Sequence, residues 1–173
     1  MAVKKVAVIT GAARGIGLAT AKTFASKGWD VALVDWDDNE LQTVASALPD
    51  ALLLTHDVSD PAQASAIMSD TLARFGQIDA LINNAGVADF GPIEETTFER
   101  WRAVMAVNLD GVFLCSQAAI PALKETRGAI VNIASISGLR ASTLRVAYGT
   151  SKAAVLHLSE QQAAELGEYG IRA

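Results

Sequence analysis

The sequence has little cysteine, little histidine and no excess of positive charge. A single cysteine, Cys115, cannot form an internal disulfide or a cysteine-cluster metal site. The two histidines, His56 and His157, are too isolated in the sequence to add a site, so we expect no metal. The 14 basic residues are outnumbered by 19 acidic ones, and a net charge of −5 disfavours nucleic acid as a main partner.

Long hydrophobic runs are also missing. We find no window with the uninterrupted apolar length of a membrane span, and we predict no membrane partner. Met1 to Lys5 lead directly into a strand-like run without the pattern of a cleavable leader, so the expected location is the cytoplasm. With 51% apolar and 19% charged residues, the 173 residues are typical of one globular domain spanning 1–173.

Short apolar runs alternate with longer helical patterns along the chain. The predicted strands are 6–10, 31–35, 51–55, 78–82 and 128–134. The predicted helices run over about 15–27, 37–48, 61–75, 98–126 (with a break near Asp110-Gly111) and 146–168. Apolar strands alternating with helices indicate an α/β fold, a doubly wound parallel sheet of Rossmann type. Binding residues then belong at the carboxyl ends of the strands, where we place Thr10, Asp35, Asp57, Asn83 and Ser135.

A glycine-rich turn follows the first strand and opens the first helix. Gly11, Gly15 and Gly17 would let main chain approach a pyrophosphate, and the helix beginning near Gly15 offers free amide donors. Asp35 closes the second strand, where a carboxylate can accept bonds from ribose hydroxyls and would repel a 2′-phosphate. Arg14 favours NADP instead, because a basic residue there could reach such a phosphate. We favour NAD over NADP as the cofactor.

Tyr148 and Lys152 are four residues apart, which places them on one helix face, with Ser135 upstream. Removing the proton of a tyrosine near neutral pH requires roughly 4 kcal/mol of stabilisation. A helix N-terminus supplies only about 0.3–2 kcal/mol, whereas a cation about 4 Å away supplies roughly 4 kcal/mol at an effective dielectric near 20. Lys152 is therefore expected to do most of this, and Ser135 to hold the substrate oxygen.

These motifs together resemble the classical short-chain dehydrogenase/reductase family. The segment from Thr10 to Gly17, which includes Ile16, looks like the cofactor loop of that family, and Asp57-Val58 resembles its adenine contact. Asn83-Asn84-Ala85-Gly86 is similar to the signature that borders the cofactor. The resemblance implies that Asn108 anchors a water in a proton relay, and that Ser135, Tyr148 and Lys152 are catalytic.

The same resemblance implies hydride transfer between nicotinamide and an alcohol or carbonyl substrate, with Tyr148 as acid or base and Lys152 also contacting the nicotinamide ribose. Trp36 is placed to flank the adenine, and a plain surface aromatic is an equal alternative. After the tyrosine helix the family continues with a strand, a substrate helix and a final strand. We therefore expect the chain to be truncated before the last two strands.

Two other functional interpretations stay open: an NAD-binding sensor or scaffold without catalysis, and an inactive fragment of the enzyme. The helix over about 106–122 is apolar on nearly every side, which favours cover by a second subunit, and the resemblance implies a homodimer or homotetramer. Arg140 and Arg145 lie between Ser135 and Tyr148. They could meet an anionic substrate group, but we interpret them as solvated loop charges. Cys115 is expected to be a buried structural thiol.

Overall fold

The computed structural model describes residues 4–173, so the first part of the leader prediction, Met1–Val3, lies outside the described residues. Five parallel strands form one sheet in the order β3-β2-β1-β4-β5. They are β1 (Val6–Thr10), β2 (Asp30–Asp35), β3 (Leu52–Thr55), β4 (Ala80–Asn83) and β5 (Ala129–Asn132). The chain builds the sheet outward from β1 through β2 to β3 and then continues with β4 on the other side of β1. A doubly wound sheet opens a crevice at this change of direction, between β1 and β4.

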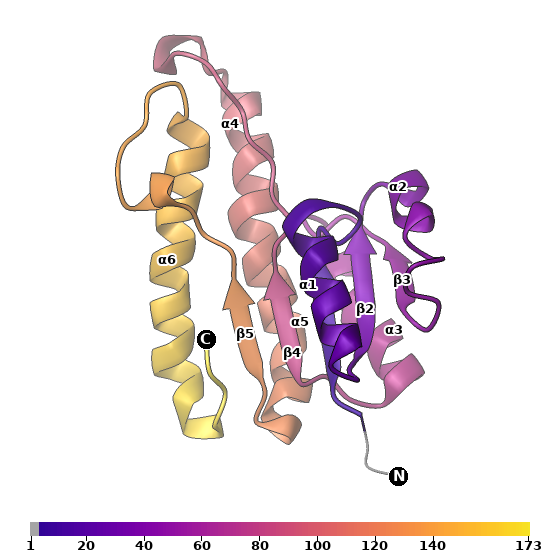
Figure 1. Cartoon of the computed structure of the whole chain (residues 1–173). Coiled ribbons are helices and arrows are strands. Elements are labelled where there is room, and N and C mark those ends of the chain that lie inside the picture. The colour runs from indigo at the N-terminus through magenta and orange to yellow at the C-terminus, as the bar shows by residue number, and fades with distance from the viewer. Residues whose placement is uncertain (1–3) are drawn as a thin grey trace.

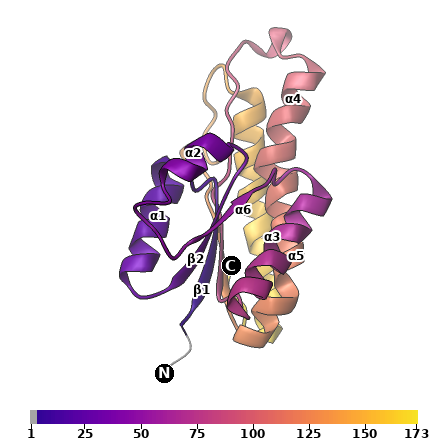
Figure 2. The ribbon, with the colours of Figure 1, turned by 90° about the vertical axis from the view of Figure 1, so that its right-hand side faces the viewer.

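Helices cover both faces of the sheet (Figure 2). One face carries α1 (Gly15–Ser26) and α2 (Asp38–Thr43), and the other carries α3 (Pro61–Phe75), α5 (Gly111–Thr126) and α6 (Val146–Leu166). Alternate strand residues enter the two cores, since Ala7 and Ile9 pack on the α1 side while Val8 packs on the α3 side. This arrangement confirms the predicted doubly wound α/β sheet.

The helix that the sequence predicts over 98–126 is continuous rather than broken near Gly111. It consists of α4 (Phe98–Met105), a wider π-helical turn (Ala106–Asp110) and α5. The prediction was wrong because Gly111 stays helical and packs against Val58, where an added Cβ would meet a methyl carbon at 2.8 Å. The irregular turn instead surrounds Asn108, whose side chain is fully buried.

By length and composition, the continuous helix Phe98–Thr126 could cross a membrane: it has 29 residues, and an 18-residue window within it has a mean hydropathy of 1.5. This differs from the expectation that no segment reaches that length. One such helix is weak support for a membrane span, because the core helices of globular proteins pass the same test. Here α5 packs against α3 and against the sheet.

The second helix is much shorter than predicted, since α2 ends at Thr43 instead of continuing to Leu48. The Thr43 hydroxyl donates to the carbonyl of Glu40, and Val44 donates to the carbonyl of Leu41, three residues back. A β-branched pair with local bonds of this kind favours tight turns over a regular helix. Strand β5 is also shorter than the predicted 128–134, and the strand predicted at 78–82 is β4.

Candidate active site

The glycine-rich turn after β1 is tied to the end of β4 by main-chain and side-chain bonds. The Asn84 amide group donates to the carbonyls of Thr10 and Gly11, each at 3.0 Å, and the Thr10 hydroxyl accepts from the main chain of Asn84 and Ala85. An added Cβ on Gly11 or Gly17 would lie within 3 Å of neighbouring main-chain atoms, so the turn has no room for side chains there. The Asn-Asn-Ala-Gly segment therefore fixes the shape of the turn.

Gly15 differs from the other two glycines of the turn. Its φ is +57°, a left-handed conformation that favours glycine, and an added Cβ would meet no atom within 4 Å. The position therefore faces open space at the start of α1, a 12-residue helix with free amides in its first turn. This cradle fits a pyrophosphate, so the residues present suit a dinucleotide.

A cleft of about 310 Å³ opens beside this turn at the carboxyl ends of the strands. It brings together most of the residues predicted to bind the cofactor: Gly11, Arg14, Asp35, Trp36, Asp57, Val58, Asn84, Ala85 and Gly86. Its lining does not include Gly15, Ile16, Gly17, Tyr148 or Lys152. The sequence analysis did not assign the other lining residues, His56, Val34, Val87 and Val107, to the site.

Two of the charged residues that line this cleft, Asp35 and Arg14, are held by bonds to neighbouring residues. The Asp35 carboxylate accepts from the amides of Ala13 (3.1 Å) and Asp37 (3.3 Å), which holds it at the end of β2. The Arg14 guanidinium forms an ion pair with Glu40 of α2, with Nη1 and Oε1 at 3.1 Å. Arg14 is thus occupied by a carboxylate that the sequence analysis did not consider. Trp36 is 70% exposed on the rim.

Lys152, which the sequence predicts to be catalytic, is buried beside the cofactor cleft. Its side chain is only 4% exposed, and Nζ donates to the Ile133 carbonyl at 2.7 Å and lies 5.9 Å from the centre of the Tyr148 ring. Burial lowers the pKa of the Lys152 ammonium below its usual range, because the charged form loses water. An added Cβ on Gly86 would lie 3.6 Å from Nζ, so Lys152 borders the cofactor cleft.

Asn108 and Ser151 connect the π-helical turn to the catalytic helix. The Asn108 amide group donates to the Val87 carbonyl (2.9 Å) and to the Ser151 hydroxyl (3.0 Å), while its oxygen accepts from the Val87 amide. Ser151 donates in turn to the carbonyl of Tyr148. Both amide hydrogens of Asn108 are used within the protein. The sequence analysis missed Ser151, whose one signal is a small polar residue next to Lys152.

Ser135 lies beyond β5, at the start of the short turn Ile136–Gly138 that packs on α6. Its hydroxyl accepts from the Ser137 amide at 3.2 Å. Gly138 approaches the main chain of Lys152 so closely that an added Cβ would be 2.7 Å from its carbonyl carbon. The turn therefore sets the distance between Ser135 and the tyrosine helix, a role that spacing alone does not reveal.

Cys115 is completely buried in α5, and burial raises the pKa of its thiol to about 12. A thiol in that environment stays protonated and inert, which agrees with the predicted structural role. His157 lies exposed on α6 beside Glu160. Neither residue joins the constellation around Lys152.

Comparisons with known proteins agree with the family that the sequence motifs resemble. A sequence profile described as short chain dehydrogenase matches residues 5–173. The chain is 41% identical to a meso-2,3-butanediol dehydrogenase of Serratia marcescens and 39% identical to a 3-alpha-(or 20-beta)-hydroxysteroid dehydrogenase of Mycobacterium tuberculosis. Each alignment covers 97% of this chain, which spans 68% and 65% of those two relatives, respectively.

Solved structures give a similar result. The chain is similar to a 3-ketoacyl-(acyl-carrier-protein) reductase from Brucella melitensis complexed with NADH, with a TM-score of 0.94 at 33% identity, over 99% of this chain and 74% of the other. A short-chain dehydrogenase from Streptomyces avermitilis also gives a TM-score of 0.94 at 33% identity, over 99% of this chain and 64% of the other.

Proposed function

Because the chain belongs to the short-chain dehydrogenase family, we propose that it transfers a hydride between a nicotinamide cofactor and a secondary alcohol or ketone. The observation that supports this best is the buried Lys152 ammonium, 5.9 Å from the centre of the Tyr148 ring and next to the cofactor cleft. A bound nicotinamide would supply the hydride acceptor or donor. The substrate is a small alcohol or carbonyl compound.

In this proposal Tyr148 moves the proton. Its phenolate oxygen accepts the proton of the alcohol in oxidation, and its hydroxyl returns the proton to the carbonyl oxygen in reduction, while Ser135 donates a hydrogen bond to the same substrate oxygen. A unit charge about 6 Å away stabilises a phenolate by roughly 3 kcal/mol at an effective dielectric near 20. That is most of the roughly 4 kcal/mol required near neutral pH, so Lys152 remains the main source.

Asn108 acts in the proposal as a positioning residue. Through Ser151 it ties the π-helical turn to the carbonyl of Tyr148, and through Val87 it ties the same turn to the loop after β4. The water that the family resemblance implies at Asn108 would then be held by main-chain atoms or by the remaining acceptor site of the side chain.

NAD is the proposed cofactor in preference to NADP. Asp35 supplies a carboxylate at the cleft, and a 2′-phosphate placed there would be repelled. Arg14, the residue that could compensate, is already paired with Glu40. The Brucella neighbour is complexed with NADH, which is compatible with this choice.

Catalysis is favoured over the sensor and inactive-fragment interpretations, because a binding protein does not require an ammonium desolvated beside a phenol. The cytoplasmic location and the homodimer or homotetramer remain predictions.

The proposal is tested by Tyr148→Phe, with Tyr169→Phe as the matched control. Tyr169 is the other tyrosine of the chain and is 40% exposed, and its ring lies under Lys124, far along the chain from Tyr148. In the full chain, Tyr148→Phe is expected to lower kcat by about 10²–10⁴-fold and to leave NADH binding, measured by fluorescence, within about twofold. Turnover equal to that of Tyr169→Phe would exclude Tyr148 as the acid/base.

A further inference from the structure

A second hollow, of about 550 Å³, lies between the loop after β4 and the loop after β5, at the start of the catalytic helix. Its lining includes four residues that carry hydroxyl groups: Ser137, Ser142, Thr143 and Thr150. Among the described residues that form its wall, Arg145 alone carries a charge. The hollow thus combines one guanidinium with several small donors and acceptors, and it is distinct from the nucleotide cleft.

Arg145 is held in place by Phe90, which lies next to it in space, and by Leu144, which precedes it in the sequence. Its guanidinium carbon is 4.8 Å from the centre of the Phe90 ring, a cation–π contact. Leu144, just before it, has φ +62°, a conformation that is uncommon for a residue other than glycine. The Leu144 carbonyl accepts from the Gly91 amide at 3.1 Å, so the same loop pair is joined twice.

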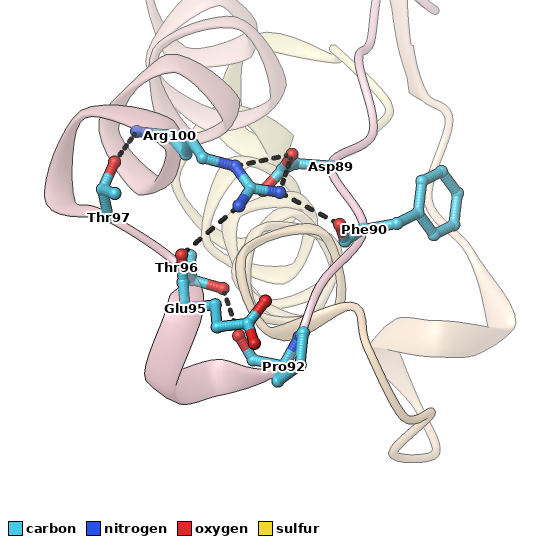
Figure 3. A network of polar contacts seen from close by, with 7 residues as sticks. All are labelled: Asp89, Phe90, Pro92, Glu95, Thr96, Thr97 and Arg100. Carbon is cyan, nitrogen blue, oxygen red and sulfur yellow. Dashed lines mark hydrogen bonds and ion pairs between the residues drawn. The ribbon is translucent and has the colours of Figure 1, made fainter.

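The loop that presents Phe90 is itself fixed by Arg100 of α4 (Figure 3). The Arg100 guanidinium donates twice to one carboxylate oxygen of Asp89, at 2.7 and 3.1 Å, and also to the carbonyls of Phe90 and Glu95. Figure 3 shows the Phe90 ring extending away from this network. Arg100 therefore forms its ion pair within this loop, whereas Arg145 forms none among the described residues.

No carboxylate of residues 4–173 lies within ion-pair distance of Arg145. Arg145 immediately precedes α6 and its carbonyl accepts from the Gly149 amide, so it stands about one turn before Tyr148. A guanidinium that is aligned by an aromatic ring and has no anionic partner is suited to a planar or tetrahedral anion. This favours the alternative that the sequence left open, in which Arg145 meets an anionic substrate group.

We propose that this hollow binds an anionic group of the substrate, with Arg145 as the cation that recognises it. The inference rests on the proposed function, because Arg145 stands about one turn before Tyr148, where the alcohol or ketone would react. It names the substrate class as hydroxy or keto compounds bearing a carboxylate or a phosphate, as opposed to neutral polyols or sterols.

The test is calorimetric binding to the full chain saturated with NAD, so turnover is not required. The probes are 3-hydroxybutyrate against its methyl ester, for a carboxylate, and glycerol 3-phosphate against glycerol, for a phosphate. At least one anion is expected to bind at least about tenfold more tightly than its neutral counterpart, and the pair that shows this identifies the anion. Arg145→Gln should bring the two members of that pair within about twofold of each other, and Arg145→Lys should give an intermediate ratio.

Arg140→Gln is the matched control, since Arg140 lies exposed on the same loop and is not among the residues that line the hollow. It should keep the full preference for the anion. NADH binding and the melting temperature, measured on each variant, identify any that has not folded, and the Lys variant then carries the comparison.

Equal binding of anion and neutral compound, no binding of either, or loss of the preference in Arg140→Gln would overturn the proposal. If the preference for the anion depends on Arg145 but no hydride transfer is detected, the hollow remains assigned as an anion site and the proposed function is rejected. If hydride transfer depends on Tyr148 but anionic and neutral compounds react equally well, the proposed function stands and the anion site is rejected.

Discussion

Three charged residues carry the proposed preference for NAD over NADP. Asp35 faces the cleft, and Arg14, which also lines it, is held by Glu40 at 3.1 Å. We predict that Asp35→Asn raises the affinity for NADP relative to NAD by about tenfold, since it removes repulsion but keeps an acceptor for the amide of Ala13. Adding Glu40→Gln should raise the ratio further by freeing Arg14. Dissociation constants for both cofactors, measured by NAD(P)H fluorescence, check this.

The asparagine variant is preferred over Asp35→Ala, because alanine would also release the amides of Ala13 and Asp37 and disturb the turn. If the ratio is unchanged in Asp35→Asn, the carboxylate does not contact the ribose. If Glu40→Gln adds nothing in that background, the Arg14–Glu40 pair is only a surface ion pair of small energy.

Residues recognised by their chemical type were readily predicted, whereas those that act through main-chain contacts were not. Gly11, Asp35 and Gly86 could be assigned to one cleft because strand ends converge at one edge of a parallel sheet. The carbonyl of Ile133, which accepts from Lys152, carries no signal in its side chain. The Arg14–Glu40 pair joins a loop to a helix that begins 24 residues later, so spacing could not reveal it.

At the scale of elements, the contact between the Ile136–Gly138 turn and α6 holds Ser135 relative to the helix that carries Tyr148, the two residues proposed to act on the substrate. We predict that Gly138→Ala destabilises the fold by about 1–3 kcal/mol, because its Cβ would lie 2.7 Å from main-chain atoms of Lys152. Moving the turn would also displace Ser135, so kcat should fall by about tenfold or more even where the variant is folded. Urea unfolding and steady-state kinetics at low temperature measure the two effects.

Gly167→Ala is the control for that experiment. Gly167 immediately follows α6, has an ordinary negative φ, and an added Cβ there would meet nothing within 4 Å. It should be neutral in stability and in kcat. Equal behaviour of the two variants would mean that the turn can shift away from α6 without consequence.

The order and type of elements were predictable because apolar strands and capped helices carry strong local signals. For α3 the predicted start at Pro61 is confirmed, with the Asp60 carboxylate accepting from the amides of Ala62 and Gln63. The π-helical turn around Asn108 was not predictable, because it depends on bonds from Asn108 to Val87 and Ser151, which are distant in sequence. Local propensity does not encode such bonds.

At the scale of the whole molecule, the described structure leaves β5 at the edge of the sheet. Figure 1 shows no helix in front of it, and Val131 is 47% exposed on that strand. Among residues 4–173, only Arg172 pairs with this edge, through the amide of Ile130 and the carbonyl of Gly128. A partly open apolar edge strand is a template for pairing with another chain. On the opposite face, α5 exposes Phe113, also at 47%.

These two surfaces predict different kinds of self-association in residues 4–173. Contact through a helix face is isologous and closes as a dimer, whereas edge pairing by β5 does not need to close and produces larger species. We predict that light scattering after size exclusion finds both. Val131→Lys should remove the large species and keep the dimer, and Phe113→Glu should remove the dimer by placing a charge in an apolar contact. A monodisperse monomer at high concentration would contradict both interfaces, and loss of every assembled species in Val131→Lys alone would assign the dimer to β5 and not to the helix.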